Sequence, residues 1–265
     1  MAIAEDISTG DITSDAIISN QINVKAYLIA KASGVVAGLP LADYIFKSID
    51  QNINFKSLVK EGTFVSPKTK IAEISGAYKS LLMAERTVLN FVQRLSGIAT
   101  ETALYVAETK GTNTHILDTR KTLPGYRALD KYAVKVGGGT NHRFGLYDMV
   151  MLKENHIEVA GGITKAVLQV RKKVNSDIKI EVETKNLAEV QEAINNQVDV
   201  IMLDNMALNT MREAVILING KAKVEASGNM TLNRIADVAA TGVDFISVGA
   251  LTHSVSALDI SMLIE

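Results

Sequence analysis

Residues 119–156 read TRKTLPGYRALDKYAVKVGGGTNHRFGLYDMVMLKENH, a stretch unlike the rest of the chain in its charge. It holds seven Lys or Arg against three acids, so its formal charge is +4, whereas the remainder carries −5 of the total of −1. A solvated charged helix would alternate its signs, but here cations gather around a Gly-Gly-Gly turn among apolar residues of strand type. The stretch therefore predicts a pocket for a multiply anionic small molecule.

Outward from this stretch, short apolar runs alternate with helical stretches along the second part of the chain. We expect strands at residues 115–118, 148–152, 178–182, 198–203, 223–225 and 245–248. This alternation is typical of βα units around a parallel sheet. The remaining length is too short for eight units of about 30 residues each. We therefore expect an incomplete α/β barrel of about six strands over residues 98–265.

Residues 1–97 have the pattern of a separate, sandwich-like α+β domain. Strands are expected at residues 24–32, 53–59 and 69–74, and a helix from Pro40 to about residue 49. An amphipathic helix should cover residues 78–95 and end at Ser96-Gly97, with a second helix over about 99–110. The last helix of the barrel is expected to pack back on this first domain.

Polar residues follow each of the six predicted barrel strands. They are Arg120 and Lys121, then Lys153, Glu154 and Asn155, then Glu183, then Asp204 and Asn205, then Ser227-Gly228-Asn229, and finally Gly249 with Thr252 and His253. A single polar strand end has no special meaning, and a lone lysine can be solvated or a lone acid can cap a helix. Six in succession point to the carboxyl-terminal rim, where α/β barrels build their active sites.

The composition excludes several classes of protein and site. The chain has no Cys, which excludes disulfides, thiolate nucleophiles and Cys-based zinc sites and fits the reducing cytoplasm. The acidic start, MAIAEDISTGDIT, lacks the apolar core of a signal peptide, and no apolar run is long enough for a membrane span. A net charge near zero and 5% aromatic residues argue against nucleic-acid binding.

Three motifs within residues 119–156 carry a family resemblance: TRKT-x-PG-x-R, K-x-A-V-x-x-GGG-x-NHR and L-K-E-N-H. They resemble the nicotinate-nucleotide pyrophosphorylase family, also called quinolinate phosphoribosyltransferase. The similarity runs from GDIT near the start of the chain to SVGALTHS near its end. It implies an enzyme that joins quinolinate to phosphoribosyl pyrophosphate and releases pyrophosphate and CO₂, in NAD biosynthesis, and it implies the same incomplete barrel.

The resemblance also implies roles for individual residues. Quinolinate, a dicarboxylate, would be bound by Arg86, Arg120, Lys121, His142, Arg143 and Lys153. The phosphates would be bound by Ser227, Gly228, Asn229, Gly249 and His253. Family members commonly have two glycines where this chain has Gly228-Asn229, and Asn tolerates left-handed backbone better than most residues.

The acids Glu183 and Asp204 would bind ribose hydroxyls and ligate Mg²⁺, and they would offset positive charge on the ribose as pyrophosphate leaves. Catalytic roles are implied for these two acids and for Lys121. The resemblance further implies a homodimer in which Arg86, from the partner's first domain, completes the site; without it, an arginine extending from the core edge is the simpler interpretation. Two alternatives remain: a molybdenum-transport-associated paralogue with another substrate, or a non-catalytic anion-binding protein on the same scaffold.

Overall fold

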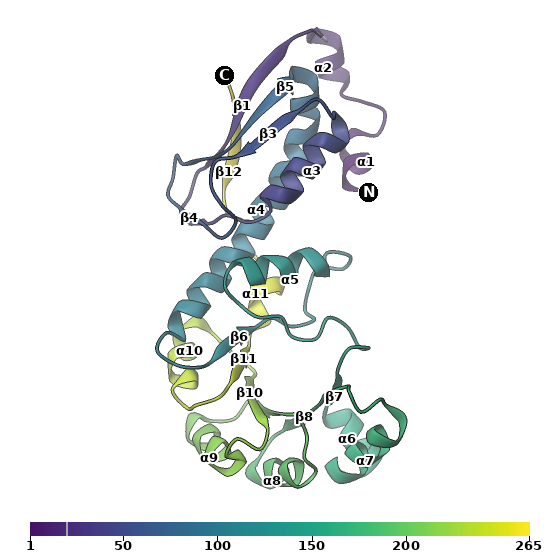
Figure 1. The fold of residues 1–265 in the computed structure, drawn as a ribbon, viewed down its shortest axis with the longest axis vertical. Coiled ribbons are helices and arrows are strands. Elements are labelled where there is room, and N and C mark those ends of the chain that lie inside the picture. The colour runs from purple at the N-terminus through teal and green to yellow at the C-terminus, as the bar shows by residue number, and fades with distance from the viewer. Residues whose placement is uncertain (20) are drawn as a thin grey trace. The chain divides into compact units, whose positions relative to one another are not determined.

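The computed structural model describes residues 1–19 and 21–265, which form two compact units (Figure 1). Unit 1 comprises Met1–Ala103, Tyr132–Gly138 and Ser254–Glu265, and unit 2 comprises Leu104–Lys131 and Gly139–His253. The expected boundary lay between residues 97 and 98, whereas the units do not follow a single cut. Every helix of the described residues is too short or too polar to cross a membrane.

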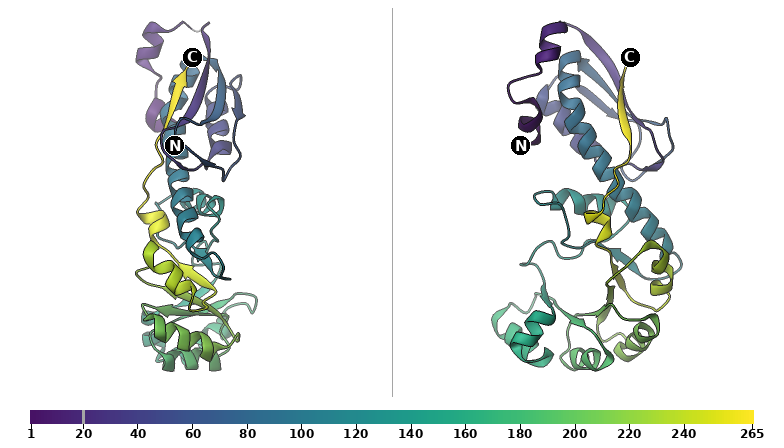
Figure 2. Two further views of the ribbon diagram at one scale, coloured as in Figure 1. Left: turned by 90° about the vertical axis from the view of Figure 1, so that its left-hand side faces the viewer. Right: turned by 180° about the vertical axis from the view of Figure 1, so that it is seen from behind.

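Unit 1 is built on a four-stranded antiparallel sheet. Its order is β12 (Ile260–Ile264), β1 (Asn23–Ala30), β5 (Lys70–Ala77), β3 (Asn54–Ser57). The C-terminal strand β12, yellow in Figure 2, lies beside the purple strand β1. The expectation of a last helix packing on this domain is therefore wrong in the type of element. Strand β1 offers these residues an edge to pair with, and the pairing extends over five residues.

The other elements of unit 1 are helices, the last of which continues into unit 2, and a small two-stranded antiparallel sheet. They are α1 (Ala2–Ile7), α2 (Ile12–Ile17), α3 (Leu39–Ile49), α4 (Tyr78–Glu108), β2 (Gly34–Val35) and β4 (Phe64–Val65). Buried residues of α3 and α4, such as Phe46, Leu81 and Val88, share one apolar core with β1 and β5. The pattern of apolar residues at helical spacing therefore identified the core face of α4.

Two expectations about α4 are wrong. The helix does not end at Ser96-Gly97 but continues to Glu108. Gly97 is there for close packing, because a Cβ at this position would overlap the backbone carbonyl of Ser256. Arg86, expected to share the buried face of the helix, is exposed.

Unit 2 is an open barrel of six parallel strands, which confirms the predicted fold class. The order is β6 (His115–Leu117), β11 (Phe245–Ser247), β10 (Lys223–Ser227), β9 (Val200–Asp204), β8 (Ile180–Thr184), β7 (Val150–Leu152). Strands β6 and β7 are the two edges, so the sheet does not close. The chain between them includes a helix, α5 (Arg127–Val136), which begins in unit 2 and whose residues from Tyr132 onward belong to unit 1.

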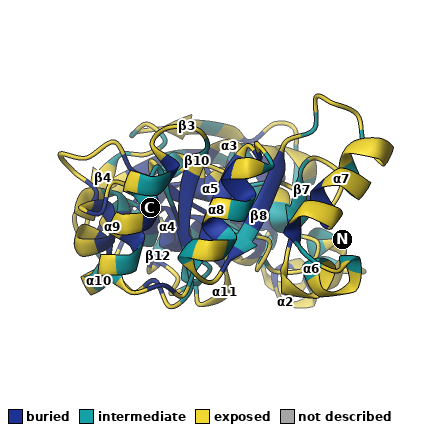
Figure 3. Ribbon diagram, turned by 90° about the horizontal axis from the view of Figure 1, so that it is seen from below, coloured by how far each residue is buried: buried dark blue, intermediate teal, exposed yellow. Residues whose placement is uncertain are grey.

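Helices follow the other strands of unit 2 and cover its outer face. They are α6 (Glu154–Ala160), α7 (Ile163–Lys173), α8 (Leu187–Asn195), α9 (Leu208–Ile218), α10 (Leu232–Ala239) and the short α11 (Ala250–His253). Figure 3 shows strands β8 and β10 buried, with α8 in front of them exposing its outer side. Helices thus pack on the outer face of the sheet, and its inner face is available to form a site.

Candidate active site

A pocket of about 730 Å³ lies within unit 2 at the carboxyl ends of its strands. Residues that alternate along each strand line it, because side chains of a strand point to opposite faces in turn. Parallel register brings equivalent positions together: Asp204 pairs with Ser227, and Met202 pairs with both Glu183 and Glu225. The register of the sheet therefore sets the relative positions of the pocket's polar groups.

All but one of the site residues expected from the sequence line this pocket. Those present are Arg120, Lys121, His142, Arg143, Lys153, Glu183, Asp204, Ser227, Gly228, Asn229, Gly249 and His253. The exception is Arg86, which belongs to unit 1. Residues remote in sequence are thus gathered into one site by the fold of unit 2 alone.

The cations of the pocket come mainly from the chain between β6 and β7. Arg143 donates from Nη1 to the carbonyl of Met149 at 3.0 Å, which holds its guanidinium in place. Partial burial and the neighbouring charge of Arg120 lower the pKa of Arg143. The two guanidinium groups thus repel each other, and an anion bound between or beside them would relieve that repulsion.

Lysines complete the cationic side. The carbonyl of Lys121 accepts a hydrogen bond from Thr252 Oγ1 at 2.9 Å, which ties the segment after β6 to helix α11. Lys153 directly follows β7, and its backbone N–H donates to His156 Nδ1 at 3.0 Å. This contact holds the start of helix α6 beside Lys153.

Glu183 and Asp204 lie at the ends of the adjacent strands β8 and β9. Burial raises the pKa of Glu183, and the charge of Asp204 raises it further. Asp204 is oriented by its neighbours, because Asn205 Nδ2 donates to Asp204 Oδ2 at 3.0 Å and Asn229 Nδ2 donates to Asn205 Oδ1 at 3.1 Å. Two carboxylates at the ends of adjacent strands are a suitable pair of oxygen ligands for a divalent cation such as Mg²⁺.

The turn after β10 requires left-handed backbone. Gly228 has φ +93°, and a Cβ there would overlap the side-chain amide of Asn205. Asn229 follows with φ +50°, a left-handed conformation that Asn adopts at low cost. Gly249, after β11, is close to both Lys121 and His253, with room for no larger residue unless those side chains move. The two turns therefore bring backbone close to the pocket, as a phosphate site needs.

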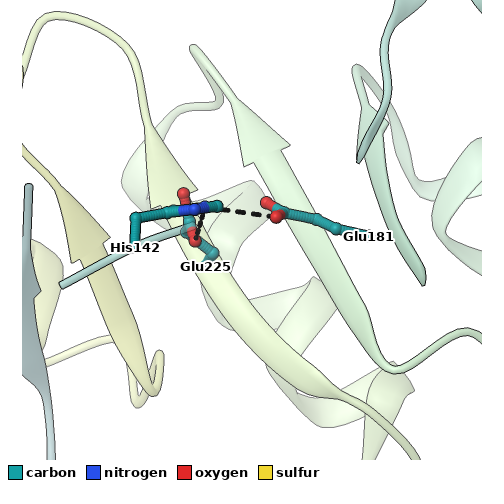
Figure 4. A group of neighbouring side chains, drawn as sticks. All are labelled: His142, Glu181 and Glu225. Carbon is teal, nitrogen blue, oxygen red and sulfur yellow. Dashed lines mark ion pairs between the residues drawn. The ribbon is translucent and has the colours of Figure 1, made fainter. Parts of the chain in front are cut away.

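His142 lies between two buried glutamates of the barrel interior (Figure 4). Its Nε2 is 3.2 Å from Glu181 Oε2, on β8, and 3.3 Å from Glu225 Oε2, on β10. Both glutamates are at most 1% exposed, and Oε1 of each is buried without a hydrogen-bond partner. Burial of ionised carboxylates with so few hydrogen-bond donors costs free energy, and this cost falls when the cluster of the two glutamates and His142 binds additional protons.

The hydrogen bonds of the ring locate its proton. The backbone N–H of Arg143 donates to His142 Nδ1 at 2.6 Å, so in this geometry Nδ1 accepts a hydrogen bond and Nε2 is the nitrogen that donates toward the glutamates. Burial raises the pKa of Glu181 to about 7, and although burial lowers the pKa of His142, the two glutamates raise it to about 10. At neutral pH the raised pKa values of Glu181 and His142 therefore keep more protons on the cluster than these two groups would hold in water.

The same contact bears on metal binding. His142, Glu181 and Glu225 offer ligand atoms within 4.8 Å of one another. A proton on Nε2 removes the lone pair that a metal would need. In this arrangement the cluster is a hydrogen-bonded group rather than a metal site, and both ring nitrogens of His142 are already engaged.

Comparisons with known protein families agree with the fold. The quinolinate phosphoribosyl transferase N-terminal domain matches residues 11–96, and the C-terminal domain of the same family matches residues 98–263. The chain belongs to the quinolinate phosphoribosyltransferase family. The resemblance found in the sequence is confirmed.

Named relatives of this family are similar over nearly the whole chain. The probable nicotinate-nucleotide pyrophosphorylase [carboxylating] of Synechocystis sp. is 49% identical over 98% of this chain and 89% of the relative. The chloroplastic nicotinate-nucleotide pyrophosphorylase [carboxylating] of Arabidopsis thaliana is 45% identical over 100% of this chain and 81% of the relative. The crystal structure of NadC from Streptococcus pyogenes has a TM-score of 0.97 at 41% identity, covering 100% of this chain and 94% of that one.

Two buried residues at the site of this quinolinate phosphoribosyltransferase were missed from the sequence: Glu225, which lines the pocket, and Glu181, which contacts the lining residue His142. Each stands two positions before a residue that was identified, Glu183 and Ser227 respectively. Alternation along a strand puts such pairs on one face, so the signal was present.

Proposed function

We propose that the pocket of unit 2 is the active site at which this chain performs the reaction of its family. The chain is a nicotinate-nucleotide pyrophosphorylase (carboxylating), a phosphoribosyltransferase of NAD biosynthesis. It converts quinolinate and phosphoribosyl pyrophosphate to nicotinate mononucleotide, pyrophosphate and CO₂. The named relatives carry this enzyme's name and lend no support to a transport-associated paralogue or a non-catalytic binder.

One observation carries the assignment of the site: the pocket has a cationic side and an acidic side. Arg120, Lys121, Arg143 and Lys153 supply the cations. Quinolinate has two carboxylates on a planar ring, and guanidinium groups match carboxylates with paired hydrogen bonds. The cationic side therefore suits quinolinate, with His142 close to Arg143.

The acidic side suits the phosphoribosyl half. The turns at Gly228-Asn229 and Gly249, with Ser227 and His253, present small groups and backbone N–H donors suited to phosphate. Glu183 and Asp204 would hold ribose hydroxyls and Mg²⁺. Bound there, Mg²⁺ would neutralise charge on the departing pyrophosphate.

The chemistry then depends on alignment and fixed charge. The ring nitrogen of quinolinate forms a bond to the anomeric carbon as the bond from that carbon to pyrophosphate breaks. Glu183 and Asp204 stabilise the positive charge that develops on the ribose. The bond from carbon 2 to its carboxylate then breaks, CO₂ departs, the positively charged ring nitrogen stabilises the electron pair left on carbon 2, and that carbon takes up a proton to give the product. Holding both substrates in line removes much of the entropic cost of their meeting.

The test is turnover of quinolinate against nicotinate, with nicotinate mononucleotide as the measured product. Nicotinate lacks the second carboxylate and would leave cations of the pocket without an anionic partner in the bound complex, which should lower its specificity constant by about 100-fold or more. Comparable turnover of the two acids would contradict the assignment of the cationic side.

We also propose a homodimer whose site includes Arg86 of the partner subunit. Arg86 is exposed on α4, where it is available to another chain. Arg86→Ala and Lys153→Ala should each be nearly inactive alone but recover activity when co-expressed, because a mixed dimer has one intact site. With random pairing about half the dimers are mixed, so about a quarter of all sites should be active. Mixed dimers confirmed by mass without recovery would place Arg86 outside the site.

The location of the enzyme is a separate proposal. Lack of Cys is compatible with a cytoplasmic protein, and we propose that location here. The plant relatives are named chloroplastic or mitochondrial. Fractionation of the native cells, followed by detection of this chain, would decide the point.

A further inference from the structure

Lys131 and Asp118 form a second buried cluster, which contacts the main chain of the pocket residue His142. Lys131 lies on α5 and Asp118 directly follows β6, and their side chains form an ion pair. Lys131 is 1% exposed and Asp118 is 0% exposed. Neither residue lines the pocket, so neither is placed to touch a substrate.

The ion pair engages the main chain of a single residue, His142. The His142 N–H donates to Asp118 Oδ1 at 2.9 Å. Lys131 Nζ donates to the His142 carbonyl oxygen at 3.1 Å. Both polar groups of the His142 main chain are therefore held by the two members of one buried ion pair.

Main-chain hydrogen bonds join Thr140, two residues before His142, to strand β6 and to Asp118, which follows it. Thr140 N–H donates to the carbonyl of Ile116 at 2.8 Å, and Asp118 N–H donates to the carbonyl of Thr140 at 3.2 Å. The segment that approaches the pocket is thus tied to the sheet up to residue 140. From there the Lys131–Asp118 pair sets where His142 lies, and His142 in turn seats its ring between Glu181 and Glu225.

The energetics make a purely stabilising role for this pair a poor explanation. Burying a lysine and an aspartate costs several kcal/mol in desolvation, and apolar residues of similar size often stabilise a fold as well or better. What an apolar pair could not supply is a donor for the His142 carbonyl together with an acceptor for its N–H. The contacts therefore favour a geometric role.

We propose that Lys131 and Asp118 are positioning residues for quinolinate: their ion pair fixes the His142 main chain and so directs Arg143 to the pocket. The next residue, Arg143, carries the consequence, since its N–H donates to His142 Nδ1 and its guanidinium extends to Met149. This inference rests on the assignment of Arg143 and His142 to quinolinate in the proposed function.

The main experiment is Lys131→Met, with steady-state kinetics for each substrate. The variant removes the donor to the His142 carbonyl and keeps an unbranched apolar stem. We expect the KM for quinolinate to rise about 10- to 100-fold, as misplacement of a binding group by about 1 Å can produce. The KM for phosphoribosyl pyrophosphate should change less than about threefold. The matched control is Lys223→Met, which breaks the exposed Lys223–Asp244 pair of the same residue types and should leave both constants unchanged.

A second variant separates positioning from stability. Asp118→Leu combined with Lys131→Met removes both charges, so no buried charge is left unpaired. We expect the melting temperature to recover toward the wild-type value while the KM for quinolinate stays high. Recovery of both together would show that the pair serves only the fold and would overturn the inference. This variant also provides the test if Lys131→Met alone does not fold.

A third readout does not depend on activity. The chain has four histidines, so ¹⁵N spectra of the imidazole nitrogens can be resolved. Wild-type His142 should show a protonated Nε2 and an unprotonated Nδ1, and the double variant should show loss of that defined state. An unchanged His142 signal with an unchanged KM for quinolinate would overturn the inference. Failure of the wild type to use quinolinate would instead refute the proposed function.

Discussion

The two sides of the pocket are held in place by different means. The acidic side consists of residues at the ends of β8, β9, β10 and β11, where parallel pairing sets each position relative to its neighbours. Much of the cationic side lies on the chain that joins the edge strands β6 and β7, which do not pair with each other. That chain is fixed by buried side chains instead, namely the Lys131–Asp118 pair and the His142–Glu181–Glu225 cluster.

This difference predicts different responses to substitution. On the acidic side, a side chain can be removed with little disturbance to the backbone, so its chemical role should be exposed directly. On the cationic side, removal of a buried group should displace several binding groups at once. The predictions below examine first the acidic side, then the turn beside it, and then the buried cluster of the cationic side.

The largest effect is expected from Glu183→Ala and Asp204→Ala. Each should lower turnover by about 100-fold or more, because the charge that stabilises the ribose and holds Mg²⁺ is lost. Binding of quinolinate, measured by calorimetry, should change less than about threefold. Chelation of Mg²⁺ from the wild type should have a similar effect on turnover. Asp237→Ala, an exposed acid of α10, is the control. Loss of quinolinate binding in a folded variant would mean that the two sides are not separate.

Next in size is Gly228→Ala. The residue has φ +93°, and a Cβ would overlap the amide of Asn205, which orients Asp204. We expect the KM for phosphoribosyl pyrophosphate to rise about 10-fold and the fold to lose about 1–2 kcal/mol. Gly220→Ala is a matched control, because Gly220 has φ +73° with nothing within 4 Å of the added Cβ. If both variants alter that KM equally, backbone strain rather than the contact with Asn205 is responsible.

The buried cluster should give a smaller effect, seen in the dependence of stability on pH. The folded-state pKa of Glu181 is raised to about 7 and that of His142 to about 10. A raised pKa means stability that is fully present below the unfolded-state pKa and is lost as pH rises through the folded-state value. The cluster's contribution should therefore fall from about pH 4.5 to about pH 10. In Glu181→Gln the melting temperature should decline less over the lower part of this window, by roughly 2–4 °C for each kcal/mol. Parallel curves for variant and wild type would show that the cluster does not bind protons differently on folding.

The smallest effect is expected from Asn229→Gly, which restores the two glycines common in the family. Asn229 already has φ +50°, so Gly removes little strain, and only the hydrogen bond to Asn205 is lost. Turnover and both KM values should stay within about threefold of the wild type. A large gain in activity would show that the Asn229 side chain obstructs the phosphate turn.

The sequence by itself determined much of the architecture and most of the site. Alternating apolar runs identified all six barrel strands, because strand propensity and the contrast between strand and helix are local properties. The polar residues that follow those strands could be predicted for the same reason. The GGG-x-NHR and L-K-E-N-H motifs identified the family.

Only the tertiary structure decided how distant residues meet. Glu181 and Glu225 join His142 because the register of β8 and β10 and the path of the loop bring them together. In the sequence Lys131 is one of seven cations of the charged stretch, but in the structure it is buried in an ion pair with Asp118. Gly97 reads as a helix end, yet the helix continues because another segment packs against it. In each case the stabilising contact is made with a residue from another segment of the chain. The sequence near each residue does not identify that partner.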